Sequence, residues 1–121
     1  MLIFRLGAVL ANSKTHQVPL RGALGLRDAP ELAVMLGAAL ETHAAVTLDA
    51  GELAEADVSI LQVIVAARHT AAAAGKALRL KAPADGALLG LLVRAGFLGA
   101  DGAPRSDAER FWTDIAKGRA A

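Results

Sequence analysis

The fold is decided by one stretch of sequence, which begins with Val46-Thr47-Leu48-Asp49 and ends with Asp57-Val58-Ser59-Ile60-Leu61-Gln62. The β-branched and apolar residues before Asp49 predict a short buried strand over 45–48. The seven residues 50–56 include a glycine and two glutamates, and they are predicted to form a loop. Asp57 suits a helix N-cap, and the apolar residues after it predict a largely buried helix to about residue 74, ended by a glycine.

Strands and helices are predicted to alternate on both sides of this stretch. Asp28-Ala29-Pro30-Glu31 has the composition of a helix start, and apolar residues then recur at helical spacing to Leu40. Residues 77–81 alternate apolar and basic side chains, as a strand with one exposed face does. The further predicted elements are strands over 2–10 and 16–22, a helix over about 85–95 and a C-terminal helix over about 106–118.

The length and this order of elements predict the fold class. With 121 residues the chain can build one hydrophobic core but not two. Strand–helix–strand units favour parallel neighbours with helices packed on the sheet. We therefore expect a single α/β domain over 1–121, with a core over about 16–98. Its sheet should be mixed and have four to five strands, with the C-terminal helix added.

Composition excludes several classes of protein. The formal net charge is +1 and no long basic run occurs, so nucleic-acid binding is not expected. Cysteine is absent, which excludes disulfides, thiol catalysis and cysteine metal sites and fits a cytoplasmic location. The N-terminus lacks the basic region of a signal peptide. The longest apolar stretch, 60–74, contains Arg68 and His69 and is shorter than the roughly 20 residues of a membrane span, so no direct membrane insertion is expected.

Candidate catalytic residues are few. The three histidines lack metal-ligand spacing, and no glycine-rich phosphate loop follows a strand. The carboxylates of Glu52, Glu55 and Asp57 cluster in sequence and could form an acid–base pair or a metal site. A solvated loop in which Asp57 caps a helix accounts for them more simply. We therefore expect no catalytic residue, no metal site and no cofactor.

Ser59 lies at the start of the predicted central helix, directly after a strand and a loop. In open α/β sheets the carboxyl ends of the strands gather into a binding surface. A phosphate on a serine there would add about −1.5 to −2 charges to a docking surface. The simpler alternative is an ordinary first-turn serine that bonds the backbone.

The ordered motifs of the central segment resemble the STAS family. In that family a buried strand ends in an aspartate, a loop follows, and an Asp-Ser-Ser-Gly-Leu type of motif opens a helix. Here the matching residues are Val46-Thr47-Leu48-Asp49 and Asp57-Val58-Ser59-Ile60-Leu61. Further matching segments are Leu20-Arg21-Gly22-Ala23-Leu24, Gly75-Lys76-Ala77-Leu78-Arg79-Leu80 and Arg94-Ala95-Gly96-Phe97.

This resemblance implies a non-enzymatic regulatory module, like the STAS antagonists of anti-sigma factors. Such a module binds an anti-sigma factor, a serine kinase or a histidine kinase-type signalling protein, and phosphorylation of the motif serine blocks binding. On this chain the serine is Ser59. The departures are Val58 and Ile60 on either side of it, and a β-branched residue there would crowd an approaching partner backbone. The implied partner-binding residues are Glu52, Glu55, Asp57, Val58 and Gln62.

Two alternatives stay open. Some STAS proteins are constitutive structural subunits of membrane transport complexes, such as those for phospholipid transport, and others accompany chemotaxis or two-component systems.

The adjacent Phe111 and Trp112 either cover the sheet or a helix, or one of them forms a secondary interface with a partner or with a second copy in a homodimer. A small enzyme using the clustered carboxylates is the third reading.

Overall fold

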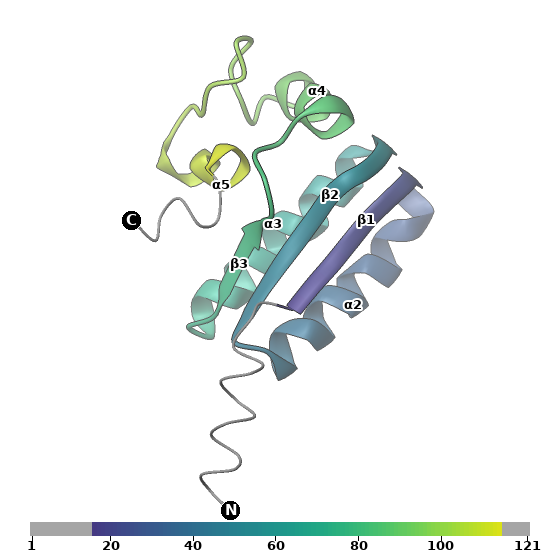
Figure 1. The fold of residues 1–121 in the computed structure, drawn as a ribbon, viewed down its shortest axis with the longest axis vertical. Coiled ribbons are helices and arrows are strands. Elements are labelled where there is room, and N and C mark those ends of the chain that lie inside the picture. Colours follow the sequence, from purple (N-terminus) through teal and green to yellow (C-terminus); the bar gives the residue numbers. More distant parts are fainter. Residues whose placement is uncertain (1–15, 115–121) are drawn as a thin grey trace, which may run out of the picture.

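The computed structural model describes residues 16–114 and shows an α/β arrangement (Figure 1). Short 3-10 turns, η1 and η2, precede two of its helices. In chain order the elements are β1 (His16–Leu24), η1 (Leu26–Asp28), α2 (Ala29–Thr42), β2 (Ala45–Ala56), α3 (Val58–Ala73), β3 (Ala77–Leu80), α4 (Gly86–Arg94), η2 (Asp107–Glu109) and α5 (Arg110–Thr113).

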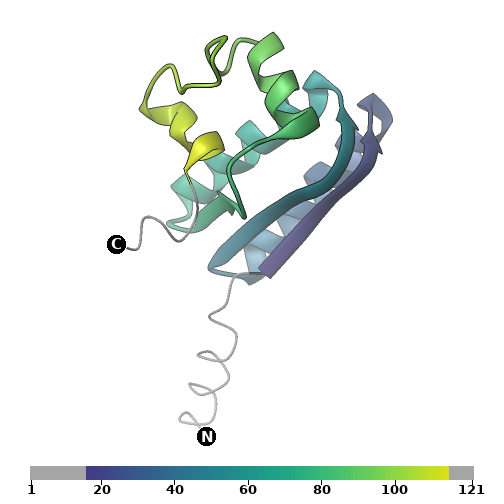
Figure 2. The ribbon, with the colours of Figure 1, turned by 45° about the horizontal axis from the view of Figure 1, so that its top comes forward.

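The sheet has the strand order β1-β2-β3, and both strand pairs are parallel. Each connection is a crossover helix, and α2 and α3 lie on the same face of the sheet (Figures 1 and 2). The opposite face carries mainly exposed residues such as Arg79 and Lys81. The carboxyl ends of β1 and β2 therefore meet at one end of the sheet, where η1 and α3 begin.

Over residues 16–114 the structure has fewer strands than the four to five predicted for the whole chain, and the three strands predicted in this range are present. Residues 16–114 hold three strands and not four or five, and no antiparallel strand pair makes this sheet mixed. The strand expected over 2–10 lies outside the described residues. Strand–helix–strand units joined by α2 and α3 account for the parallel order.

The loop expected over 50–56 is in fact the second half of β2, which runs to Ala56 and pairs with β1 up to Leu24–Ala56. β2 has one extra residue at each of two register shifts. Opposite them on β1, the first shift lies between Pro19 and Arg21 and the second between Gly22 and Ala23. Gly22 has a backbone φ of +70°, a conformation that residues with a side chain rarely adopt. The prediction failed because the segment lacks apolar alternation and β-branched residues, and pairing with β1 overrides that weak propensity.

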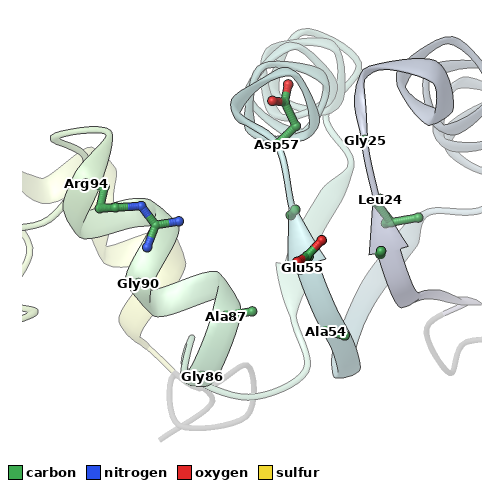
Figure 3. A pocket seen from close by; sticks show the side chains of 11 residues that line it. Leu24, Gly25, Ala54, Glu55, Asp57, Gly86, Ala87, Gly90 and Arg94 are labelled. Atoms are coloured by element: carbon green, nitrogen blue, oxygen red, sulfur yellow. The ribbon is translucent and has the colours of Figure 1, made fainter.

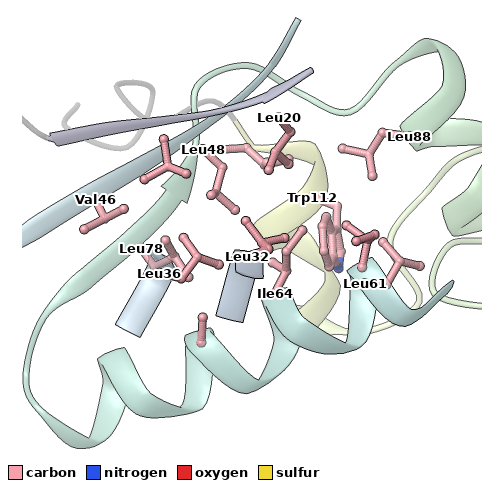
Figure 4. Packing of buried hydrophobic residues seen from close by; sticks show 14 of the residues in the cluster. Leu20, Leu32, Leu36, Val46, Leu48, Leu61, Ile64, Leu78, Leu88 and Trp112 are labelled. Carbon is pink, nitrogen blue, oxygen red and sulfur yellow. The ribbon is translucent and has the colours of Figure 1, made fainter. Parts of the chain in front are cut away.

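One hydrophobic core joins the sheet to all the longer helices (Figure 4). The expected alternation holds in β1 and β3, where Val18, Leu20, Leu78 and Leu80 are buried. They contact the apolar stripe of α2 and the buried face of α3, and the buried leucines of α4 belong to the same core. The inward residues are almost all aliphatic, which lets the helices lie close to the strands.

The C-terminal elements complete the core through Trp112, whose side chain is fully buried. Its ring contacts Phe97 and Phe111 edge-on, with centroid distances of 6.0 and 4.8 Å. The Arg68 guanidinium lies 4.4 Å above the Phe111 ring. The predicted helix over 106–118 is present as η2 and the short α5, and residues 115–118 lie outside the described part. Trp112 is too buried to be an exposed anchor in this fold.

Replacing Trp112 with alanine should lower the free energy of unfolding by about 3–5 kcal/mol, because it leaves a cavity in a core of small side chains. Denaturant unfolding followed by circular dichroism measures this loss. Phe111→Ala is the matched control, since Phe111 is only partly buried and should cost less. Equal losses in both variants would contradict a special role for Trp112.

Asp49 holds the first bulge of β2 together. Its carboxylate accepts the Gly51 N–H at 3.0 Å and lies 3.6 Å from Lys81 Nζ. The Gly51 bond, together with the charge of Lys81, lowers the pKa of the Asp49 carboxyl. A carboxyl with a lower pKa in the folded state stabilises the fold above its unfolded pKa of about 3.9. That stabilisation is lost as pH falls through the folded value.

Asp49→Asn should therefore reduce stability at pH 6 by up to about 1 kcal/mol, because the pair is largely solvent-exposed. The difference from the wild type should shrink below about pH 4. Unfolding measured between pH 3 and 7 tests this. In a Lys81→Met background the effect of Asp49→Asn should be smaller. A difference that stays constant with pH would count against the charge as its cause.

Candidate docking site

The start of α3 is built around the carboxylate of Asp57. The Asp57 backbone N–H donates to the Leu24 carbonyl at 3.0 Å, which fixes the end of β2 against the end of β1. The Asp57 side chain then accepts the Ser59 N–H at 2.9 Å, as an N-cap does. Hydrogen bonding from Ser59 lowers the pKa of the Asp57 carboxyl, so the cap is an anion at neutral pH. The predicted cap is confirmed.

Ser59 is the second residue of α3, in the first turn after the cap. The Oγ atom is buried and has no hydrogen-bond partner among the described residues. Ser59 and Gln62 line one side of a groove of about 460 Å³ between α2 and α3, which is otherwise lined mainly by small and aliphatic residues. The predicted phosphorylation site is therefore not presented to solvent at its oxygen atom.

Two large apolar side chains flank the cap on the outside. Val58 is 43% exposed and Leu26, in η1, is 71% exposed. The η1 turn contacts α3, so both side chains belong to the same end of the molecule. We call this surface, made of Leu26, Asp57, Val58, Ser59 and Gln62, the docking end. Leu26 was not predicted as a site residue, because a single leucine in a turn belongs to no sequence motif.

The two glutamates of the predicted site lie on β2 and not on a loop. Glu52 pairs with Arg21 of β1 at 3.4 Å and is five residues, roughly 16 Å of extended chain, from Asp57. Glu55 is exposed near the end of the strand. The structure therefore places Glu55, Asp57, Val58, Ser59 and Gln62 around the helix start, and it separates Glu52 from them.

A cleft of about 540 Å³ opens beside the docking end, between α4 and the ends of β1 and β2 (Figure 3). Glu55 and Asp57 line one wall, and Gly86, Gly90 and Arg94 of α4 line the other. The α4 wall was not predicted from the sequence, although its glycines and arginine recur at the four-residue spacing of one helix face.

Within residues 16–114, no three histidine or acidic side chains gather as metal ligands would. In the same part of the chain, no helix has the length and apolarity needed to cross a membrane. The arrangement offers instead exposed apolar side chains, an anionic cap and a neighbouring cleft, which are features of a binding surface.

Comparison with known proteins identifies the family. The family model described as "Mlab, STAS domain" matches residues 8–99, about three quarters of the chain. No individual curated protein and no solved structure matched significantly. STAS domains are generally non-enzymatic modules that mediate protein–protein interactions and regulation. The matched region includes every strand that the structure describes together with the whole docking end, and the chain belongs to the STAS domain family.

Proposed function

We propose that this chain is a non-enzymatic regulatory module of a bacterial signalling system that binds a protein partner through the docking end. The observation that carries the proposal is the pair of exposed apolar side chains, Leu26 and Val58, around the motif serine. Exposed apolar side chains grouped at a defined surface are typical of interaction sites. The partner class is an anti-sigma factor, a serine kinase or a histidine kinase-type signalling protein.

The docking end has the composition that an interface requires. Full burial of an exposed valine or leucine side chain contributes about 1.5–3 kcal/mol, and Leu26, at 71% exposed, can gain most of this and Val58, at 43% exposed, less than half. Asp57 and Gln62 surround them with polar groups that set orientation. Glu55 adds a carboxylate at the edge, where charges affect association rate and specificity more than affinity.

Phosphorylation of Ser59 is the regulation that we propose for this module. A phosphate there would add about −1.5 to −2 charges beside the anion of Asp57 and next to Val58. Like-charge repulsion and desolvation would then oppose docking. Because Ser59 Oγ is buried, a kinase could reach it only after the first turn of α3 opens.

That burial also favours a second candidate, a constitutive subunit of a membrane transport complex such as one for phospholipid transport. In a constitutive subunit the buried hydroxyl needs no access to a kinase. The exposed, β-branched Val58 agrees with this reading, since it restricts the backbone approach that the switch requires, whereas Ile60 is fully buried in the core. Both candidates use the same docking end and differ only in what happens at Ser59.

Val58→Lys should weaken binding of the copurifying partner at least tenfold, because a charge replaces a buried apolar contact. The partner is first identified from wild-type chain co-expressed with the products of neighbouring genes, and affinity is then measured by calorimetry. Val34→Lys is the matched control, since Val34 is an exposed valine on α2, outside the docking end. Unchanged affinity for Val58→Lys would overturn the proposal.

Ser59→Asp separates the two candidates in the same assay. Loss of the partner with a retained circular dichroism spectrum is the result expected of the phosphorylation switch. Undiminished binding would rule out the switch and leave the constitutive subunit. Ser59→Ala controls for the loss of the hydroxyl alone and should bind as the wild type does.

A further inference from the structure

The second half of β2 has a strand neighbour on one side only. Its pairing with β3 ends at Leu48, whose carbonyl accepts the Lys81 N–H at 2.8 Å. Its pairing with β1 continues for eight more residues, to Ala56. Within residues 16–114 no strand takes the place beside β2 beyond Leu48. The chain leaves β3 there and returns as α4, on the far side of the cleft (Figures 1 and 3).

The backbone of β2 offers hydrogen-bonding groups to this cleft. The Asp57 N–H is turned toward β1, so the N–H of its neighbour Ala56 is turned to the opposite side. Ala54 is the extra residue of the second bulge and has no counterpart on β1. Unpaired groups on a strand edge are a template for another extended chain.

The side chains that line the cleft are mostly small, which favours the approach of another backbone. The side chains on the strand side include Ala54 and Ala56, and those on the helix side include Gly86, Ala87 and Gly90. A neighbouring strand must come within about 4.8 Å of β2 in the hydrogen-bonding direction. The small side chains of these alanines and glycines obstruct an approaching backbone less than larger residues would.

Charges of opposite sign face the cleft from its two walls. The Arg94 guanidinium lies over Gly90, where a Cβ atom would come within 3.2 Å of Arg94 Nη1. Glu55 and Asp57 stand on the strand side (Figure 3). None of the three charges makes an ion pair with another described residue. The carboxylates of Glu55 and Asp57 oppose edge pairing with acidic or purely apolar chains, so they favour a segment with a basic side chain.

We propose that the cleft binds a short extended peptide segment of the partner protein as an added strand beside β2. The peptide backbone bonds to Ala54 and Ala56, a basic side chain meets Glu55, and a carboxylate meets Arg94. This mode is strand addition, in which main-chain bonds give affinity and side-chain contacts give specificity. The inference rests on the proposed function as a docking module and says how part of the partner is held.

The test uses a display library of linear eight-residue peptides selected on the wild-type chain. Selected peptides should combine a basic and an acidic residue. Their addition should shift the ¹⁵N-amide NMR signals of Ala54, Ala56 and Gly90. Methylation of alternate peptide nitrogens should weaken binding at least tenfold, because it removes main-chain donors without changing the side chains.

Variants of the chain give the matched comparison. Arg94→Gln should weaken the selected peptides about tenfold, whereas Arg79→Gln, which removes an exposed arginine of β3 outside the cleft, should not. Gly90→Leu should abolish binding by filling the cleft. Gly90→Ala is the folding control, since alanine favours a helix and its Cβ shifts only the flexible end of the Arg94 side chain. Unfolding curves confirm that each variant is folded.

The proposal is overturned if the library yields no binder, if binders shift signals in the α2–α3 groove instead, or if N-methylation has no effect. These failures are distinct from failure of the proposed function. Loss of the partner in Val58→Lys together with an empty library would leave the docking end intact and remove only the added strand. Peptide binding at β2 together with undiminished partner binding by Val58→Lys would support the added strand and overturn the docking end as the partner site.

Discussion

The parallel pairing of β1 with β2 along both strands is the interaction on which the rest of the structure depends. It runs from His16–Val46 to Leu24–Ala56 and ends with the hydrogen bond from Asp57 to Leu24. That last bond sets where α3 begins and therefore where the cap, Val58 and Ser59 lie. The same pairing carries β2 past the end of β3 and so produces the cleft.

Sequence reasoning succeeded where one physical signal dominates. Alternation placed Val18, Leu20, Leu78 and Leu80 inward, and the capping chemistry of Asp57 located the start of α3. It failed over 50–56, because a strand held by a neighbour and exposed over much of its length carries no hydrophobic pattern of its own. The cleft could not be predicted, since Arg94 and Gly90 are more than thirty residues from Asp57 and only the packing of α4 brings them near it.

The motif resemblance located the helix start correctly and said little about the state of its serine. Asp57 and Ser59 occupy the expected positions, and the backbone N–H of Ser59 donates to the Asp57 carboxylate. The Ser59 hydroxyl oxygen is buried, on a residue that lines the groove between α2 and α3. The regulation proposed for Ser59 would therefore depend on the stability of one helical turn as much as on the recognition of a sequence motif. Local opening of such a turn costs less than global unfolding.

The two bulges of β2 make the docking surface sensitive to chain length as well as to chemistry. While β1 advances from Pro19 to Leu24, β2 advances from Asp49 to Ala56 and gains two residues. An even number of extra residues leaves the in-and-out order of the strand unchanged at its far end. Loss of one bulge residue, such as Ala54, would leave Leu53, Glu55 and Ala56 on their β1 partners and so on the same faces of the sheet, because paired residues point to the same side. A deletion there therefore straightens the strand and draws the start of α3 back by one residue, without turning the strand end over.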